Sequence, residues 1–263
     1  MINLATALKN VKRETWISLG SALLFLTLWE AAVDLRWVNS AFLVAPSRIV
    51  TATVALINNG ELMGDIAITL ARMFSGFFLG AILGLLVGLA MGWSKELRAV
   101  LDPIVAVIFP LPKIALLPLI MLLIGIGERP IVLIIALGAF FPVLINCMAG
   151  VMNIDQIYFD AARNYGASKF KTFTKVILPG SLPVAFAGIR LALGMSLLMA
   201  VVAELAIATN GLGAMVWLSW QTLRVERIYV AIAVIAVLGL LLNPLLQLVE
   251  KYLIPWKEEI RLR

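Results

Sequence analysis

The chain has 263 residues, of which 62% are hydrophobic and only 14% are charged. A soluble domain of this length would be roughly half apolar and about a quarter charged, so the composition excludes an ordinary soluble protein. The net charge of +6 does not indicate nucleic acid as a partner, because the charges lie between apolar blocks and there report membrane topology. The chain has no histidine and one cysteine, Cys147, which excludes an intrachain disulfide and argues against a His/Cys metal or haem site.

Apolar residues gather in six blocks, each near the roughly 20 residues that a helix needs to cross the lipid core. Their continuous apolar runs favour helices over the alternating strands of a membrane barrel. We therefore predict an all-α integral membrane protein with about six transmembrane helices, forming a single domain over residues 1–263. The predicted spans cover residues 16–33, 66–92, 104–126, 131–151, 183–207 and 228–250.

The first block follows Lys9, Lys12 and Arg13, an arrangement also found in secretory signal peptides. Trp29-Glu30 at its end is a poor cleavage site and the block is long, so we interpret it as a retained helix. Lys and Arg favour the cytoplasmic side of a membrane. If the N-terminus is cytoplasmic, most of the Lys and Arg residues that lie between the predicted spans fall on that side. Six spans then return the C-terminus to the cytoplasm.

A short amphipathic helix is predicted over residues 46–60, between the first two spans. Pro46-Ser47 at its start and Asn58-Asn59-Gly60 at its end are typical helix boundaries. We expect it on the outer surface, either as a plain surface helix or with a role in transport.

The second predicted span carries a glycine at every fourth position. Such a stripe lets two helix backbones approach closely. It serves either static tight packing or the sliding of helices during alternating access. The glycines are Gly76, Gly80, Gly84, Gly88 and Gly92.

Lys113 lies near the middle of the third predicted span, between Pro112 and Pro118. A buried ammonium group is costly in lipid and usually faces a cavity or a partner. The prolines leave backbone carbonyls without donors, which lipid cannot supply, so this stretch is predicted to line the interior.

Further ionisable residues fall inside predicted spans. Arg72 and Glu204 join Lys113 as candidate translocation-pathway residues, and Glu204 is a candidate partner for either cation. A purely structural ion pair is the alternative, and for Arg190 the preferred interpretation is a side chain that reaches the interface. An interior with net positive charge suits an anionic solute.

The segment 152–182 is predicted to form a cytoplasmic helix-turn-helix between the fourth and fifth spans. Asp155 can cap the first helix, and Gly166 permits a sharp turn after it. Ser168 can cap the second, which Leu178-Pro179-Gly180 is expected to stop before the fifth span. On pattern alone, a docking surface and an interfacial loop both explain this segment. The apolar face of the first helix holds Ile157, Ala161 and Tyr165.

This segment closely resembles the EAA loop of ABC importer permeases. Asp160-Ala161-Ala162, then Gly166, Val176 and Leu178-Pro179 fit that loop without a gap, with Asp160 for the usual Glu and Val176 for the usual Ile. Other matches look like the nitrate/sulfonate/taurine branch of these permeases. They are Pro112-Lys113-Ile114-Ala115, Pro118-Leu119, Gly125-Ile126-Gly127-Glu128, Phe141-Pro142, Glu204 and Gly211-Leu212-Gly213.

The resemblance implies the type I importer permease fold in a bacterial cytoplasmic (inner) membrane, with both termini cytoplasmic. It implies a homodimer of permeases, two ABC ATPase subunits that bind ATP and Mg, and an external solute-binding protein. The solute would be a small anion, with an alkyl sulfonate or taurine first, then nitrate, bicarbonate or another anion. In this family the EAA loop is the coupling helix that contacts the ATPase. The matching residues here are Asp160, Ala161, Ala162, Tyr165, Gly166, Leu178 and Pro179.

No Gly-x-x-x-x-Gly-Lys-Ser/Thr loop for phosphate occurs in the chain, so we expect no cofactor here and ATP hydrolysis on a separate subunit. A membrane-embedded enzyme would want a histidine, paired carboxylates or a ligand set, none of which is visible. An ATP-independent secondary transporter often shows two homologous halves, and no convincing internal repeat is present. A translocation subunit without enzymatic activity is therefore the prediction.

Overall fold

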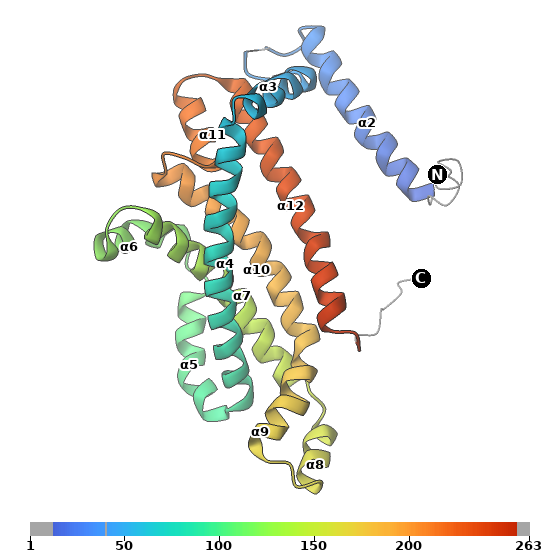
Figure 1. The fold of residues 1–263 in the computed structure, drawn as a ribbon, viewed down its shortest axis with the longest axis vertical. Coiled ribbons are helices and arrows are strands. Elements are labelled where there is room, and N and C mark those ends of the chain that lie inside the picture. The colour runs from blue at the N-terminus through green and yellow to red at the C-terminus, as the bar shows by residue number, and fades with distance from the viewer. Residues whose placement is uncertain (1–12, 40, 257–263) are drawn as a thin grey trace.

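The computed structural model describes residues 13–39 and 41–256, and within these ranges the chain is helical without strands. Lys9 and Lys12, on which the predicted orientation partly depends, lie outside them. Within the described residues, five helices are long and apolar enough to cross a membrane, and a bent helix pair raises the number to six. The molecule is elongated along these helices, with short helices at both ends (Figure 1).

Three long helices form the centre of the bundle: α4 (Glu61–Trp93), α7 (Glu128–Met152) and α10 (Leu178–Ile207). Helix α7 packs extensively against both α4 and α10. Apolar side chains from all three helices form one buried cluster between them. Its fully buried members include Met73, Ile134, Ile135, Val143 and Ala200.

The glycine stripe on α4 faces α7 along its whole length. A Cβ atom on Gly84 would lie 2.5 Å from the carbonyl oxygen of Phe140, and one on Gly88 would lie 2.5 Å from that of Leu144. Any side chain at these positions would push the two helices apart, so the glycines set how closely α4 and α7 approach.

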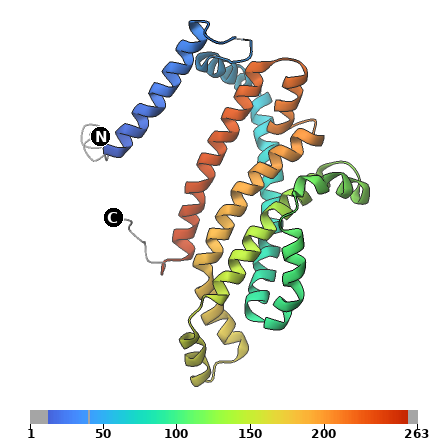
Figure 2. The same cartoon turned by 180° about the vertical axis from the view of Figure 1, so that it is seen from behind.

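Helices α2 (Arg13–Asp34) and α12 (Val225–Leu253) lie at one side of this centre, and most of their surface is uncovered within the chain. Figure 2 shows α2 standing apart from the bundle, which it joins through α3 (Pro46–Asn58). Glu30 on α2 accepts hydrogen bonds from the backbone N–H and the hydroxyl of Ser47, at 3.0 and 2.6 Å, and so fixes the start of α3. The amphipathic helix predicted over 46–60 is confirmed, beginning at Pro46.

The structure departs from the single span predicted over 104–126. Helix α5 (Lys95–Ile108) ends before Pro110, and the chain bends by 91° into a 3₁₀ turn (Lys113–Leu116) and α6 (Leu117–Ile124). Pro110 and Pro112 lack the N–H groups that would continue the helix, which accounts for the break. Lys113 therefore lies at a bend rather than in the middle of a straight span.

The segment 152–182 forms the predicted helix-turn-helix from α8 (Gln156–Asn164) and α9 (Lys169–Thr172). The Asp155 carboxylate accepts from the N–H of Ile157 at 3.0 Å, and the Ser168 hydroxyl accepts from the N–H of Lys171 at 3.3 Å. Both are the expected N-caps. Gly166 has a φ of +66°, which makes the sharp turn between the two helices.

The predicted helix stop at Leu178-Pro179-Gly180 is wrong. A π-helical turn (Phe173–Ile177) joins α9 to α10, and the helix continues through Pro179. The N–H of Leu178 bonds to the carbonyl of Phe173, five residues back instead of four. This shift in hydrogen-bond register accommodates a proline that would interrupt a regular α-helix.

One short helix was not predicted. Helix α11 (Leu212–Gln221) lies between α10 and α12, at the same end of the molecule as α3 (Figure 1). It begins after Gly211, whose φ of +100° turns the chain back from α10.

Candidate translocation and coupling sites

Glu204, for which either Arg72 or Lys113 was a candidate partner, pairs with Arg72. Arg72 on α4 is 5% exposed, and the side chain of Glu204 on α10 is fully buried. Nη1 of Arg72 lies 2.9 Å from Oε1 of Glu204. A second carboxylate, that of Glu128 at the start of α7, lies 2.6 Å from Nη2 of Arg72. We call Arg72, Glu128, Glu204, Asn210 and Thr69 the Arg72 cluster.

All five N–H donors of Arg72 are used within this cluster. Nε and Nη2 donate to the two oxygens of Glu128, each at 2.6 Å. Nη1 donates to Glu204 and to the backbone carbonyl of Asn210 at 2.8 Å, and Nη2 donates to the Asn210 side chain at 2.6 Å. A guanidinium has five N–H donors in a fixed fork, so none remains for a solute. The contacts of Arg72 therefore serve to hold α4, α7 and α10 together.

The Gly211-Leu212-Gly213 turn closes around Glu204. The second carboxylate oxygen of Glu204 accepts from the Thr69 hydroxyl at 2.9 Å and from the N–H of Gly213 at 3.0 Å. A Cβ on Gly211 would lie 2.6 Å from the carboxyl carbon of Glu204, so only glycine leaves room for the acid. The N-terminus of α11 adds its positive dipole end beside the carboxylate. The two glycines therefore serve Glu204: Gly211 leaves room for its carboxylate, and Gly213 donates a hydrogen bond to it.

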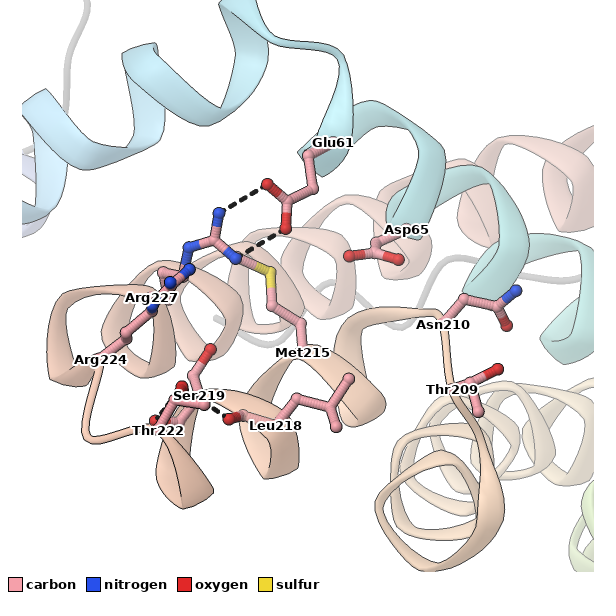
Figure 3. Close-up of a pocket in the computed structure, with 10 residues that line it drawn as sticks. All are labelled: Glu61, Asp65, Thr209, Asn210, Met215, Leu218, Ser219, Thr222, Arg224 and Arg227. Atoms are coloured by element: carbon pink, nitrogen blue, oxygen red, sulfur yellow. Dashed lines mark hydrogen bonds and ion pairs between the residues drawn. The ribbon is translucent and has the colours of Figure 1, made fainter.

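A cavity of about 400 Å³ opens beside the Arg72 cluster at this end of the molecule (Figure 3). Arg227 at the start of α12 spans its edge and donates two hydrogen bonds to Glu61 on α4, at 2.7 and 2.6 Å. The Asp65 carboxylate accepts from the N–H of Gly211 at 2.7 Å. The cavity carries both signs of charge. Its lining is Glu61, Asp65, Thr209, Asn210, Met215, Leu218, Ser219, Thr222, Arg224 and Arg227.

Lys113 does not join the Arg72 cluster. It is half-buried at the bend after α5, where its ammonium donates to the carbonyl of Phe109. The same nitrogen lies 5.0 Å from the ring centroid of Phe109 and 5.1 Å from that of Phe141 on α7, both in cation–π range. Among the described residues no carboxylate pairs with it. Of the two partners predicted for Glu204, the structure selects Arg72.

Arg190 does not simply reach out to the interface, as the sequence suggested. Its Nη2 lies 2.5 Å from Oε2 of Glu250 on α12, an ion pair that ties α10 to α12. Glu250 was missed because it lies at the end of the last predicted span and carries no motif. Glu128 is part of the Gly125-Ile126-Gly127-Glu128 motif, but the motif did not predict that Glu128 pairs with Arg72. Nothing in the local sequence singled out Thr69 or Asn210.

The predicted coupling residues lie on and beside α8, at the opposite end of the molecule from the Arg72 cluster (Figure 1). Asp160 is exposed and accepts from the Gln156 side chain at 3.3 Å. Tyr165 is 91% exposed and Ile157 is 65% exposed, so the apolar face of α8 has no cover within the chain. Leu178 and Pro179 follow the π-helical turn and are partly buried. Exposed apolar side chains on a projecting helix are typical of a protein-contact surface.

A bundle of long apolar helices with a bent helix pair is typical of a multi-pass membrane protein. The family model described as "Binding-protein-dependent transport system inner membrane component" matches residues 76–258. Because this covers more than half of the chain, the protein belongs to that family. It is a permease of the nitrate/sulfonate/taurine type, as its similarity to curated relatives shows.

The taurine transport system permease protein TauC of Escherichia coli (strain K12) is 34% identical over 95% of this chain and 93% of its own. The putative aliphatic sulfonates transport permease protein SsuC of Bacillus subtilis (strain 168) is 36% identical over 94% of this chain and 90% of its own. The riboflavin transport system permease protein RibX of Chloroflexus aurantiacus is also 34% identical, over 95% of this chain and 94% of its own.

Solved structures agree on the fold. The inward-facing MetNI methionine ABC transporter has a chain that aligns with a TM-score of 0.58 at 22% identity, over 71% of this chain and 91% of that one. A chain of an amino acid ABC transporter solved with histidines aligns with a TM-score of 0.59, also at 22% identity, over 76% of this chain and 97% of that one. The chain has the type I importer permease fold.

Proposed function

We propose that this chain is the translocation subunit of an ATP-driven importer for a small anion, with an alkyl sulfonate or taurine as the first choice of solute. The full-length similarity to TauC and SsuC is the observation that carries this proposal. RibX is equally identical to this chain, so nitrate, bicarbonate and larger solutes belong in the same uptake assay.

The subunit would work as a homodimer with two ABC ATPases, which bind ATP and Mg, and with an external solute-binding protein. The N-terminus and C-terminus would be cytoplasmic in a bacterial inner membrane. In this orientation α8 faces the ATPase, with Asp160, Ala161, Ala162, Tyr165 and Gly166 at the contact. The uncovered apolar face of α8 supports this assignment.

The opposite end would face the binding protein, and the mixed-charge cavity beside the Arg72 cluster is the polar surface available there. Arg72 and Glu204 would position the helices at the outer end of the pathway. Lys113 would supply the cation inside it. Its ammonium is held by a carbonyl and two aromatic rings instead of a carboxylate, so its positive charge is not neutralised by a neighbour.

The test is uptake in proteoliposomes that contain the permease with an ABC ATPase and a solute-binding protein. We expect taurine or an alkyl sulfonate to accumulate only with internal ATP. Lys113→Met should raise the solute concentration for half-maximal uptake several-fold, while Lys113→Arg restores it. Uptake without ATP, or failure of an ATPase to copurify, would overturn the importer assignment. Normal uptake by Lys113→Met would overturn only the role of the lysine.

A further inference from the structure

We propose that the inner end of the bundle holds a binding site for the phosphate headgroup of an anionic phospholipid. The inner-end site consists of Trp93, Lys95, Arg98, Phe159, Arg163 and Lys169. Its assignment to the cytoplasmic leaflet rests on the orientation in the proposed function, whereas the presence of a lipid site does not.

Two cavities make up this site. One has a volume of about 670 Å³ and the other about 400 Å³. Trp93, Phe159 and Arg163 line both, so the two cavities adjoin along the end of α4 and the inner side of α8. Lys169 lines the larger cavity, and Lys95 and Arg98 line the smaller one. Together they offer a space much larger than a phosphate group.

The charge of the site is strongly positive. Four of its cations form no ion pair among the residues that the structure describes. They are Lys95, Arg98, Arg163 and Lys169. Glu96 is the one acidic residue among the lining residues, and its carboxylate accepts a hydrogen bond from the Ser94 hydroxyl at 2.9 Å. Unpaired cations gathered around a cavity at a span end are typical of lipid headgroup recognition.

The site also has the apolar part that a lipid requires. Trp93 is the last residue of α4, is 45% exposed, and stacks on Phe173 with ring centroids 5.6 Å apart. Tryptophan at a span end marks the level of the lipid headgroups. A headgroup at this level would place its phosphate among the cations and its glycerol against Trp93 and Phe159.

The apolar face of α8 that we assign to the ATPase contact lies opposite this site. Phe159 and Arg163 are four residues apart and share one face of the helix. Ile157, Ala161 and Tyr165 occupy the other face, where the first and last are widely exposed. One short helix therefore presents a predicted protein-contact face on one side and a cationic, aromatic face on the other. An acidic segment of the ATPase is the competing occupant, and the experiment below distinguishes it.

The experiment is native mass spectrometry of the purified full-length permease, titrated with phosphatidylglycerol or phosphatidylcholine of the same chain length. We expect selective retention of phosphatidylglycerol by the native protein. Arg98→Gln and Arg163→Gln should each weaken it by about fivefold, the contribution expected of one cation near an anionic lipid. The matched control is Lys251→Gln, an exposed cation at the end of α12 that lines neither cavity.

Three outcomes would overturn the proposal. Equal weakening by Lys251→Gln would show that net charge alone attracts the lipid. Displacement of phosphatidylglycerol by millimolar inorganic phosphate would assign the site to a free anion. Unchanged lipid retention together with lost ATPase copurification in Arg98→Gln and Arg163→Gln would assign it to the protein partner. None of these readouts uses transport, so failure here is distinct from failure of the importer assignment.

Discussion

At the scale of single residues, the Arg72 cluster shows why charge alone does not identify a pathway residue. Arg72 and Glu204 looked like solute-binding groups in the sequence because ionisable side chains inside spans are usually functional. In the structure each hydrogen-bonding position of Arg72 is occupied by the protein itself. Lys113 differs because its neighbours carry no negative charge.

Removing Glu204 should therefore damage stability before it affects solute recognition. We expect Glu204→Ala to lower the free energy of unfolding by about 3 kcal/mol or more, because it leaves Arg72 buried with one carboxylate instead of two. The measurement is the thermal unfolding midpoint of the purified protein in detergent.

The matched control for Glu204→Ala is Glu61→Ala, which breaks the pair with Arg227. The side chains of Glu61 and Arg227 are 40% and 25% exposed. A pair this accessible contributes about 1 kcal/mol or less, so the midpoint should barely move. Equal losses in the two variants would contradict a special structural role for the Arg72 cluster.

At the scale of helices, the contact between α4 and α7 is set by the glycine stripe. We expect Gly84→Ala to destabilise the protein, because its new Cβ would lie 2.5 Å from the carbonyl oxygen of Phe140. Gly64→Ala on the same helix has nothing within 4 Å and should be neutral or stabilising, since alanine favours a helix by about 1 kcal/mol over glycine. Thermal unfolding of both variants tests this. A neutral Gly84→Ala would mean that α4 and α7 separate easily.

The turn between α8 and α9 supports a second prediction at this scale. Gly166 has a φ of +66°, which proline cannot adopt. Gly166→Pro should therefore distort the coupling helices and separate ATP hydrolysis from uptake, while the protein still reaches the membrane. Asp160→Lys, which reverses the charge on α8, should do the same. The measurements are ATPase activity, solute uptake and membrane abundance of each variant, and normal uptake by both would refute a coupling role.

Much of this architecture could be predicted from the sequence, for local reasons. The start of α3 at Pro46 and the caps at Asp155 and Ser168 depend on residues within a few positions. The 91° bend and the π-helical turn could not be predicted, since prolines alone do not reveal whether a helix breaks or shifts register. The link from Arg72 to Glu128 spans 56 residues of sequence and depends on how the helices pack.

At the scale of the whole molecule, the two ends are chemically distinct. One end has the Arg72 cluster and a cavity of mixed charge, and the other has the helix-turn-helix and the cationic inner-end site. Helices α2 and α12 remain mostly uncovered between these ends. Their apolar surfaces suit lipid or a second permease, in line with the proposed homodimer.

The proposed orientation can be measured with cysteine labelling, because the native Cys147 is buried and gives no background. We expect a membrane-impermeant maleimide to modify Tyr165→Cys only when it reaches the cytoplasmic side. Thr222→Cys, at the end of α11, should react only from the outside. Both native side chains are exposed, so each variant should be reactive from one side. Reversed accessibility would place the helix-turn-helix outside and remove its contact with an ATPase.

The π-helical turn has a mechanical consequence. Because it carries the helix through Pro179, the chain from Lys169 to Ile207 is helical without a break, a path of about 58 Å at about 1.5 Å per residue. One end adjoins the turn at Gly166 and the other bears Glu204. In the assembly that we propose, a displacement of the helix-turn-helix by the ATPase would be carried along this continuous helix to the ion pair of Arg72 and Glu204 at its other end.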